Sequence, residues 1–160
     1  MITQKIFTGG KSEVAIVCQQ CGAHKLVNMS SIKQYGKPFR VKCSCGFVFN
    51  VVFEPRGYYR KTTELFGICY KYGCDEIISD ITVRNISKTG VCFVLESKSS
   101  SMGCIKEGDM LKLQFTLNLT RRSLIRTSVI VRFIGDGIIG AEFYKPDEYT
   151  IKEIGFYLMP

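Results

Sequence analysis

The chain has 160 residues, of which 46% are hydrophobic and 22% are charged. This is the composition of an ordinary globular protein, and it excludes wholesale disorder and fibrous architectures. No apolar run approaches the ~20 residues of a membrane-spanning helix, and the first residues lack the apolar segment of a secretory signal. We therefore expect a cytoplasmic protein without a membrane partner, whose eight cysteines are thiols or metal ligands and not disulfides.

The formal net charge is +8, with 22 basic and 14 acidic residues. Residues 1–53 hold seven basic residues and a single acidic one, for a net charge of +6, whereas residues 54–160 carry +2. A basic segment of this kind suggests an anionic partner. Catalysis is not expected, because His24 is the one histidine of the chain and no dinucleotide-binding or P-loop glycine pattern occurs.

The N-terminal third contains short runs of β-branched and aromatic residues. They predict strands at 13–17, 39–42 and 47–53, with a polar loop at 27–36 between the first two. The sequence Glu54-Pro55-Arg56-Gly57 then interrupts the strand pattern. We expect a domain boundary there, which separates a small module, 1–53, from a larger domain, 54–160.

Two cysteine pairs lie at the ends of the N-terminal runs. Cys18 and Cys21 have two residues between them, Cys43 and Cys45 have one, and a glycine follows each pair. Two thiol pairs at the tips of β-runs are what a closed, tetrahedral four-thiolate zinc site requires. We predict a zinc-ribbon-like β module with a structural zinc ion on these four cysteines. The alternatives are four reduced cysteines without metal, or His24 in place of one thiol.

The C-terminal part alternates strands and turns. Strands are predicted at 64–70, 77–84, 91–96, 110–119, 124–134 and 138–144, and the last two are joined by a hairpin turn at 135–137. Asp147 is placed to cap a helix that buries Ile151, Ile154 and Leu158. Six strands at this spacing predict an all-β fold, a small antiparallel barrel or sandwich. Cys69 and Cys92 lie within strands and are predicted to be small buried hydrophobes.

Two short motifs belong to this β domain. Arg56 and Arg60 form R-x-x-x-R, and Asn85, Ser87 and Gly90 form N-x-S-x-x-G at the end of a predicted strand. Each motif alone could be an ordinary linker or turn. Together, in this order, on a six-stranded domain, they resemble the PilZ domain, the bacterial receptor for cyclic di-GMP. The segment 138–143 is also similar to the closing strand of that family.

The resemblance implies a six-stranded antiparallel PilZ-type β-barrel with a short C-terminal helix over residues 54–160. It implies a cyclic di-GMP effector that changes conformation on binding and signals to a downstream protein in motility, exopolysaccharide or virulence control. The ligand-binding residues carried over from the family are Arg56, Arg60, Asn85, Ser87 and Gly90. Secondary candidates beside the motifs are Lys61, Arg84 and Tyr59.

Simple chemistry agrees with these assignments. A guanidinium fork matches the O6 and N7 acceptors of guanine and the oxygens of a phosphate. On an extended segment Asn85 and Ser87 point to the same face. Gly90 is expected to adopt a backbone conformation closed to residues with a Cβ atom.

Two other functions fit the sequence. One is a nucleic-acid-binding zinc ribbon with a degenerate PilZ scaffold, for which the candidate phosphate contacts are Lys25, Lys33, Lys37, Arg40 and Lys42. The other is a ligand-independent adaptor for proteins, and such PilZ relatives typically lack the arginines that this chain has.

Overall fold

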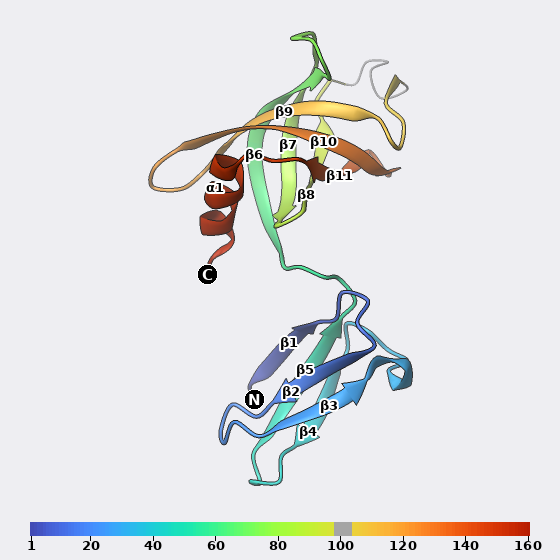
Figure 1. The fold of residues 1–160 in the computed structure, drawn as a ribbon, viewed down its shortest axis with the longest axis vertical. Coiled ribbons are helices and arrows are strands. Elements are labelled where there is room, and N and C mark those ends of the chain that lie inside the picture. The colour runs from blue at the N-terminus through green and yellow to red at the C-terminus, as the bar shows by residue number, and fades with distance from the viewer. Residues whose placement is uncertain (98–103) are drawn as a thin grey trace. The chain divides into compact units, whose positions relative to one another are not determined.

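The structure is a computed structural model that describes residues 1–97 and 104–160 (Figure 1). It divides into two compact units, Met1–Tyr59 and Arg60–Pro160. Each unit has a hydrophobic core of its own. The domain boundary that the sequence suggests, near residue 54, stays a prediction.

The N-terminal unit is built from two small sheets. Its elements are β1 (Thr3–Phe7), β2 (Glu13–Val17), β3 (His24–Asn28), the 3-10 helix η1 (Met29–Ser31), β4 (Pro38–Lys42) and β5 (Val48–Glu54). β5 is the central strand of one sheet, with β1 parallel on one side and β4 antiparallel on the other, while β2 and β3 form a hairpin. Alternate residues of β5, namely Phe49, Val51 and Phe53, are buried and form much of the core.

Two strands of this unit are not predicted from the sequence pattern. β1 is short and is held by parallel pairing with β5, almost fifty residues later in the chain. β3 is mostly polar and exposed, which is why its end was expected to be part of a polar loop. That loop prediction is wrong at its start, because Val27 and Asn28 pair with β2 and Met29 is buried in the core.

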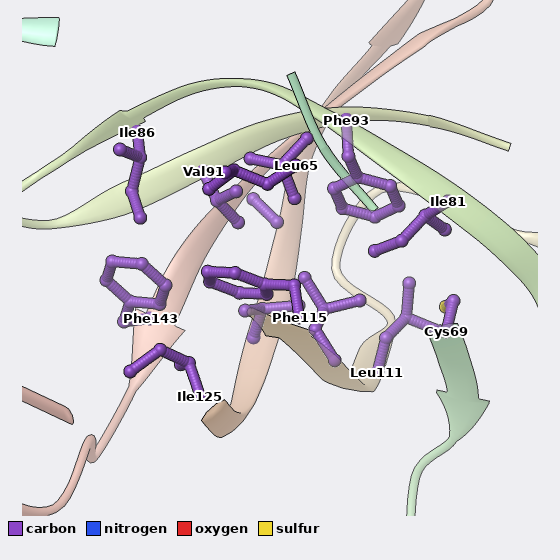
Figure 2. Packing of buried hydrophobic residues seen from close by; sticks show 14 of the residues in the cluster. Leu65, Cys69, Ile81, Ile86, Val91, Phe93, Leu111, Phe115, Ile125 and Phe143 are labelled. Carbon is purple, nitrogen blue, oxygen red and sulfur yellow. The ribbon is translucent and has the colours of Figure 1, made fainter. Parts of the chain in front are cut away.

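The C-terminal unit is a closed six-stranded antiparallel barrel with one helix. Its elements are β6 (Arg60–Lys71), β7 (Ile77–Ser87), β8 (Gly90–Leu95), β9 (Met110–Leu117), β10 (Ser123–Gly135), β11 (Ile138–Tyr144) and α1 (Glu148–Leu158). The strands close in the order β10-β11-β8-β7-β6-β9. Figure 2 shows Phe93, Phe115 and Phe143 among the side chains that fill the interior. The predicted six strands are confirmed.

Helix α1 packs against β7 and β10. The side chain of Asp147 accepts a hydrogen bond from the Thr150 backbone N–H at 2.7 Å, as expected for a cap. The predicted apolar face is partly wrong, since Ile151 is exposed and Tyr157 is buried beside Ile154. Among the described residues no helix has the length and apolar character needed to cross a membrane.

Both motif segments extend strands beyond their predicted ends. β6 begins at Arg60, and β7 continues to Ser87. In the antiparallel pairing Arg60 lies opposite Ser87, and Thr62 opposite Asn85. Backbone pairing therefore joins the last residue of R-x-x-x-R to the N-x-S-x-x-G segment and brings Arg60, Asn85 and Ser87 to one end of the β6–β7 pair.

Candidate functional site

A pocket of about 520 Å³ lies on the outside of the barrel, over β6, β7, β8, β10 and β11. This volume falls in the range of small-molecule binding sites. Four of the sequence-predicted residues, Arg60, Asn85, Ser87 and Gly90, line it. The other lining residues are Thr89, Val91, Cys92, Arg132, Phe133, Ile138, Gly140, Ala141 and Glu142.

The pocket is a trough that runs across the strands. Phe133 on β10 lies opposite Gly140 on β11, Gly140 opposite Cys92 on β8, and Cys92 opposite Asn85 on β7. Side chains in one such row share a face of the sheet. The two middle positions carry small residues between larger ones at each end. The hollow therefore has a floor at Gly140 and Cys92 and walls at Phe133 and Asn85.

Two β-bulges aim the wall residues outward. The register shifts between Val83 and Asn85 on β7 and between Val131 and Phe133 on β10. A bulge inserts one extra residue into a strand and reverses the faces of the residues that follow. Val83 and Val131 are fully buried, whereas Asn85 is partly exposed and Phe133 is 55% exposed. Regular alternation would have pointed Asn85 and Phe133 into the core.

Arg60 and Asn85 form a polar corner with Cys92. Burial raises the pKa of the Cys92 thiol, against the smaller effects of the Arg60 charge and of a hydrogen bond with Asn85, which lower it. Cys92 is therefore a neutral thiol at physiological pH. The prediction that it is a buried core residue is wrong, because it is partly exposed on the outer face, while Cys69 is fully buried as predicted.

Ser87 closes the turn between β7 and β8. Its hydroxyl oxygen accepts hydrogen bonds from the backbone N–H groups of Thr89 at 3.3 Å and Gly90 at 3.2 Å, and its side chain is almost fully buried. Asn85 and Ser87 lie on one side of the strand, with the buried Ile86 between them, as expected. In this arrangement Ser87 shapes the pocket by holding the turn.

Gly90 is required by a close backbone contact. A Cβ atom at this position would lie 2.4 Å from the carbonyl oxygen of Ala141 on β11. The backbone conformation expected from the sequence is not the reason, since Gly90 is not among the residues with positive φ. Glycine at this position therefore allows β11 to approach β8 at the edge of the trough.

We expect Gly90→Ala to lower the free energy of unfolding by about 1–3 kcal/mol, the usual cost of overpacking, because the backbone of β11 must move. Urea denaturation measures this change. Gly155→Ala is the matched control, since nothing lies within 4 Å of a Cβ there and alanine is the better helix former by up to about 1 kcal/mol. Equal stability of Gly90→Ala and the unmodified protein would contradict the close-contact explanation.

The remaining candidates make other contacts. Arg56 and Tyr59 belong to the N-terminal unit, where Arg56 Nε is 3.5 Å from Glu54 Oε1 and the Tyr59 ring meets Phe7 edge-on at 6.5 Å. Lys61 Nζ donates to the Tyr157 carbonyl oxygen at 2.9 Å, so it is directed to α1. Arg84, the extra residue of the β7 bulge, is exposed, with Nη1 4.0 Å from Glu64 Oε1.

The four predicted metal ligands come together in the N-terminal unit. The Sγ atoms of Cys18 and Cys45 are 3.8 Å apart, those of Cys21 and Cys43 are 3.6 Å apart, and all four lie within 4.8 Å of one another. These distances are too long for disulfide bonds. They match the ~3.8 Å edge of a tetrahedron with metal–sulfur bonds of ~2.3 Å. The donor set therefore fits a closed four-thiolate zinc site; His24 is not part of the cluster.

The electrostatics of the cluster differ between its thiols. A hydrogen bond from the backbone N–H of Cys45 is the main cause that lowers the pKa of Cys43 to about 6. For Cys21 a backbone hydrogen bond at Ala23 acts to lower the pKa, but hydrogen bonds with the neighbouring thiols outweigh it and raise the pKa to about 12. At neutral pH the cluster thus holds both a thiolate and a thiol, and a metal ion would displace the remaining protons.

Comparison with known proteins identifies the barrel. A family model of the PilZ domain matches residues 54–159, more than half of the chain. The chain belongs to the PilZ domain family. The resemblance drawn from the two motifs is thereby confirmed, and the PilZ match covers the whole barrel and its helix.

Two solved structures are similar to this PilZ chain. The PilZ domain of YcgR from Escherichia coli, solved with c-di-GMP, is 14% identical, with 64% of this chain and 87% of that chain covered and a TM-score of 0.49. Lpg0364, an uncharacterised Legionella protein, is 20% identical, with 62% and 89% covered and a TM-score of 0.37. No curated protein sequence matches. The family assignment therefore rests on the family model.

Sequence reasoning missed the β10–β11 side of the PilZ pocket. Arg132 Nε donates a hydrogen bond to Glu142 Oε2 at 2.9 Å, and both residues line the pocket next to Phe133. None of these residues belongs to either motif. The one available signal was the Arg-Phe pair at the end of a long alternating run, where a charged residue and a large aromatic stand side by side.

Proposed function

We propose that this PilZ protein is a cyclic di-GMP receptor, not an enzyme, and that the trough on the outside of the barrel is its ligand site. The observation that carries the proposal is that Arg60, Asn85, Ser87 and Gly90, from two segments 25 residues apart, line one pocket. Its volume of about 520 Å³ suits a small molecule.

The side chains match the chemistry of a guanine dinucleotide. The guanidinium group of Arg60 offers paired N–H donors to guanine O6 and N7 or to phosphate oxygens, and the Asn85 amide can both donate and accept. Arg56 is four residues before Arg60, so at most about 14 Å of extended chain separates them. Arg56 can then exchange its exposed pairing with Glu54 for a ligand phosphate.

The N-terminal unit supplies the output in this proposal. Ligand binding orders the segment 54–61 against the barrel and changes the orientation of the zinc-ribbon-like unit, so that a downstream protein meets a different surface. Zinc on Cys18, Cys21, Cys43 and Cys45 has a structural role, because four thiolates leave no open coordination position for a substrate. We expect this output to act in motility, exopolysaccharide or virulence control, as the family resemblance implies.

Isothermal titration calorimetry of the full chain with cyclic di-GMP tests the proposed function. We expect saturable binding together with a rise in the melting temperature of the barrel, since a ligand that binds only the folded state stabilises it. Absence of both binding heat and thermal shift would overturn the receptor assignment.

A second candidate function is nucleic-acid binding by the N-terminal unit. One observation favours it: the candidate lysines and Arg40 are all exposed, and among the described residues none has an ion pair. Arg40 and Lys42 lie on the outward side of β4, and Lys5 lies on the outward side of β1 in the same sheet. Affinity for DNA or RNA that falls steeply with salt concentration would support this function, and cyclic di-GMP binding would be independent of it.

A further inference from the structure

We infer that the outer face of helix α1, the side turned away from the barrel, is a docking surface for the same helix of a second copy of this chain. In this contact the two helices run antiparallel and cross at Gly155. The inference goes beyond the proposed function, since it concerns another part of the barrel and does not depend on cyclic di-GMP.

The outer face of α1 has an unusual polarity for a surface helix. It carries Tyr149, Ile151, Phe156 and the C-cap residue Met159, each between 46% and 62% exposed. A surface helix normally places charged and polar residues on the side that faces water. Here the charged residues of that side are Glu148 and Lys152 within the first five positions of the helix, and the rest of the face is apolar or glycine.

Other residues attach the helix to the barrel. The Glu153 side chain accepts a hydrogen bond from the Ser123 hydroxyl, and the Tyr157 hydroxyl donates to Asn118 Oδ1 at 2.8 Å. The buried residues of α1 are Thr150, Glu153, Ile154 and Tyr157. The exposed apolar side chains are therefore not needed to hold α1 in place, and leaving them in water forgoes the hydrophobic energy of burial. An exposed apolar patch of this kind marks an interaction site.

Gly155 lies in the middle of the outer face. Glycine inside a helix costs up to about 1 kcal/mol relative to alanine. The barrel does not require it, because among the described residues nothing lies within 4 Å of a Cβ at this position and its φ is not positive. Packed helices lie about 8–10 Å apart, depending on the side chains at the contact. A glycine at the crossing point allows the closest approach of a second helix.

The residues around Gly155 make the face complementary to itself. Ile151 and Met159 lie four residues before and after it, or about 6 Å along the helix in each direction. A two-fold axis through Gly155 that relates two antiparallel helices sets Ile151 of each copy against Met159 of the other. Both contacts are apolar, and they are equivalent, as a symmetric dimer requires.

The charge of Lys152 favours the antiparallel arrangement. Lys152 precedes Gly155 by three residues, so in the antiparallel pair it lies opposite the last turn of the partner helix. That turn carries partial negative charge on its unpaired carbonyl groups, and within α1, all of which is described, it contains no basic residue of its own. A parallel pair would instead bring the two Lys152 side chains together. The occupant that fits this face is therefore a second copy of α1.

Sedimentation velocity of the full chain tests the association. Two helices of 11 residues bury less than the roughly 1,200–2,000 Å² of a stable interface, so the dimer is expected to be weak, with Kd of about 10–100 μM. We expect a reversible shift from monomer to dimer as the concentration rises. A protein that stays monomeric up to about 500 μM, well above this range, would overturn the inference.

Paired substitutions test the antiparallel register. Ile151→Glu and Met159→Lys are each expected to weaken the dimer about ten-fold or more, because each buries an unpaired charge twice. An equimolar mixture of the two variants should form a heterodimer again, since one Glu–Lys contact replaces the buried single charges and the second contact is the original Ile–Met pair. Phe66→Glu on β6, 72% exposed and outside α1, is the matched control and should dimerise like the unmodified protein.

Each outcome decides the proposal. Restored association in the mixture supports the antiparallel pair at Gly155. A mixture that associates no better than either variant alone would overturn this register and with it the proposed dimer. Dimerisation that is lost in Phe66→Glu and kept in Ile151→Glu would assign the contact to the β6 surface instead. Cyclic di-GMP binding is measured separately, and its failure would leave this inference standing.

Discussion

Replacing Cys45 with serine is expected to unfold the N-terminal unit while the barrel stays folded. Structural zinc in small modules contributes about 10–16 kcal/mol of apparent binding free energy, comparable to or larger than the whole stability of a typical domain. The core of this unit contains seven buried residues. A unit of 59 residues with so small a core is marginal without a metal, so loss of one thiolate removes its main source of stability.

Hydrogen exchange measured by mass spectrometry distinguishes the two units in the full chain. We expect peptides of β1 to β5 to lose protection in Cys45→Ser, or after zinc chelation, and peptides of β6 to β11 to keep it. Elemental analysis should show one zinc ion per chain before the substitution and none after it. Cys74→Ser is the control, since Cys74 is an exposed cysteine outside the cluster. A zinc-free protein with fully protected N-terminal strands would show that the four thiols need no metal.

Arg60→Ala is expected to weaken cyclic di-GMP binding at least about a hundred-fold. Each hydrogen bond to a charged group contributes about 1.5–3 kcal/mol, and a guanidinium fork makes two of them to a guanine edge or a phosphate. Arg60→Lys keeps the charge but not the planar fork, so its affinity should lie between those of the alanine variant and the unmodified protein. Calorimetry of the three proteins measures the series.

The appropriate control for this series is Arg126→Ala. Arg126 is an exposed arginine of the same barrel whose Nε donates to Gln114 Oε1 at 3.0 Å, away from the pocket. The Arg126→Ala substitution removes one positive charge without changing a residue of the pocket. It therefore measures how much the net charge alone contributes to the affinity for an anionic ligand. Similar losses in Arg126→Ala and Arg60→Ala would mean that overall charge, and not the pocket, determines affinity. Melting temperatures within a few degrees of the unmodified protein would show that both variants remain folded.

The structure also explains how the PilZ pocket depends on elements far apart in the chain. Gly90 is next to Ala141, and Phe133 lies on the strand that pairs with β11. Ser87 holds the turn between β7 and β8, and β11 pairs with β8 as far as Gly90. A change at this turn is therefore expected to shift the strands that carry both walls of the pocket. Gly90→Ala thus tests the backbone that shapes the pocket, whereas Arg60→Ala tests a direct contact with the ligand.

The sequence by itself determined the elements that depend on local pattern. Short β-type runs separated by turn residues located all six barrel strands, and Asp147 located the helix. The spacing of Cys18, Cys21, Cys43 and Cys45 predicted a cluster that the structure brings within 4.8 Å. Local patterns suffice there because side chains repeat their direction with a fixed period along a strand or a helix, and because a helix cap or a cysteine pair involves residues only a few positions apart.

Only the tertiary structure decided which side chains face the pocket. A period-two pattern assumes an unbroken pleat, so it assigns Phe133 to the core. The bulge that turns Phe133 outward is a shift in the pairing of β10 with β11. Likewise, glycine is needed at position 90 because of the carbonyl oxygen of Ala141, a residue about fifty positions later in the sequence. Register between strands is set by pairing with a distant partner, and this information is absent from any short stretch of sequence.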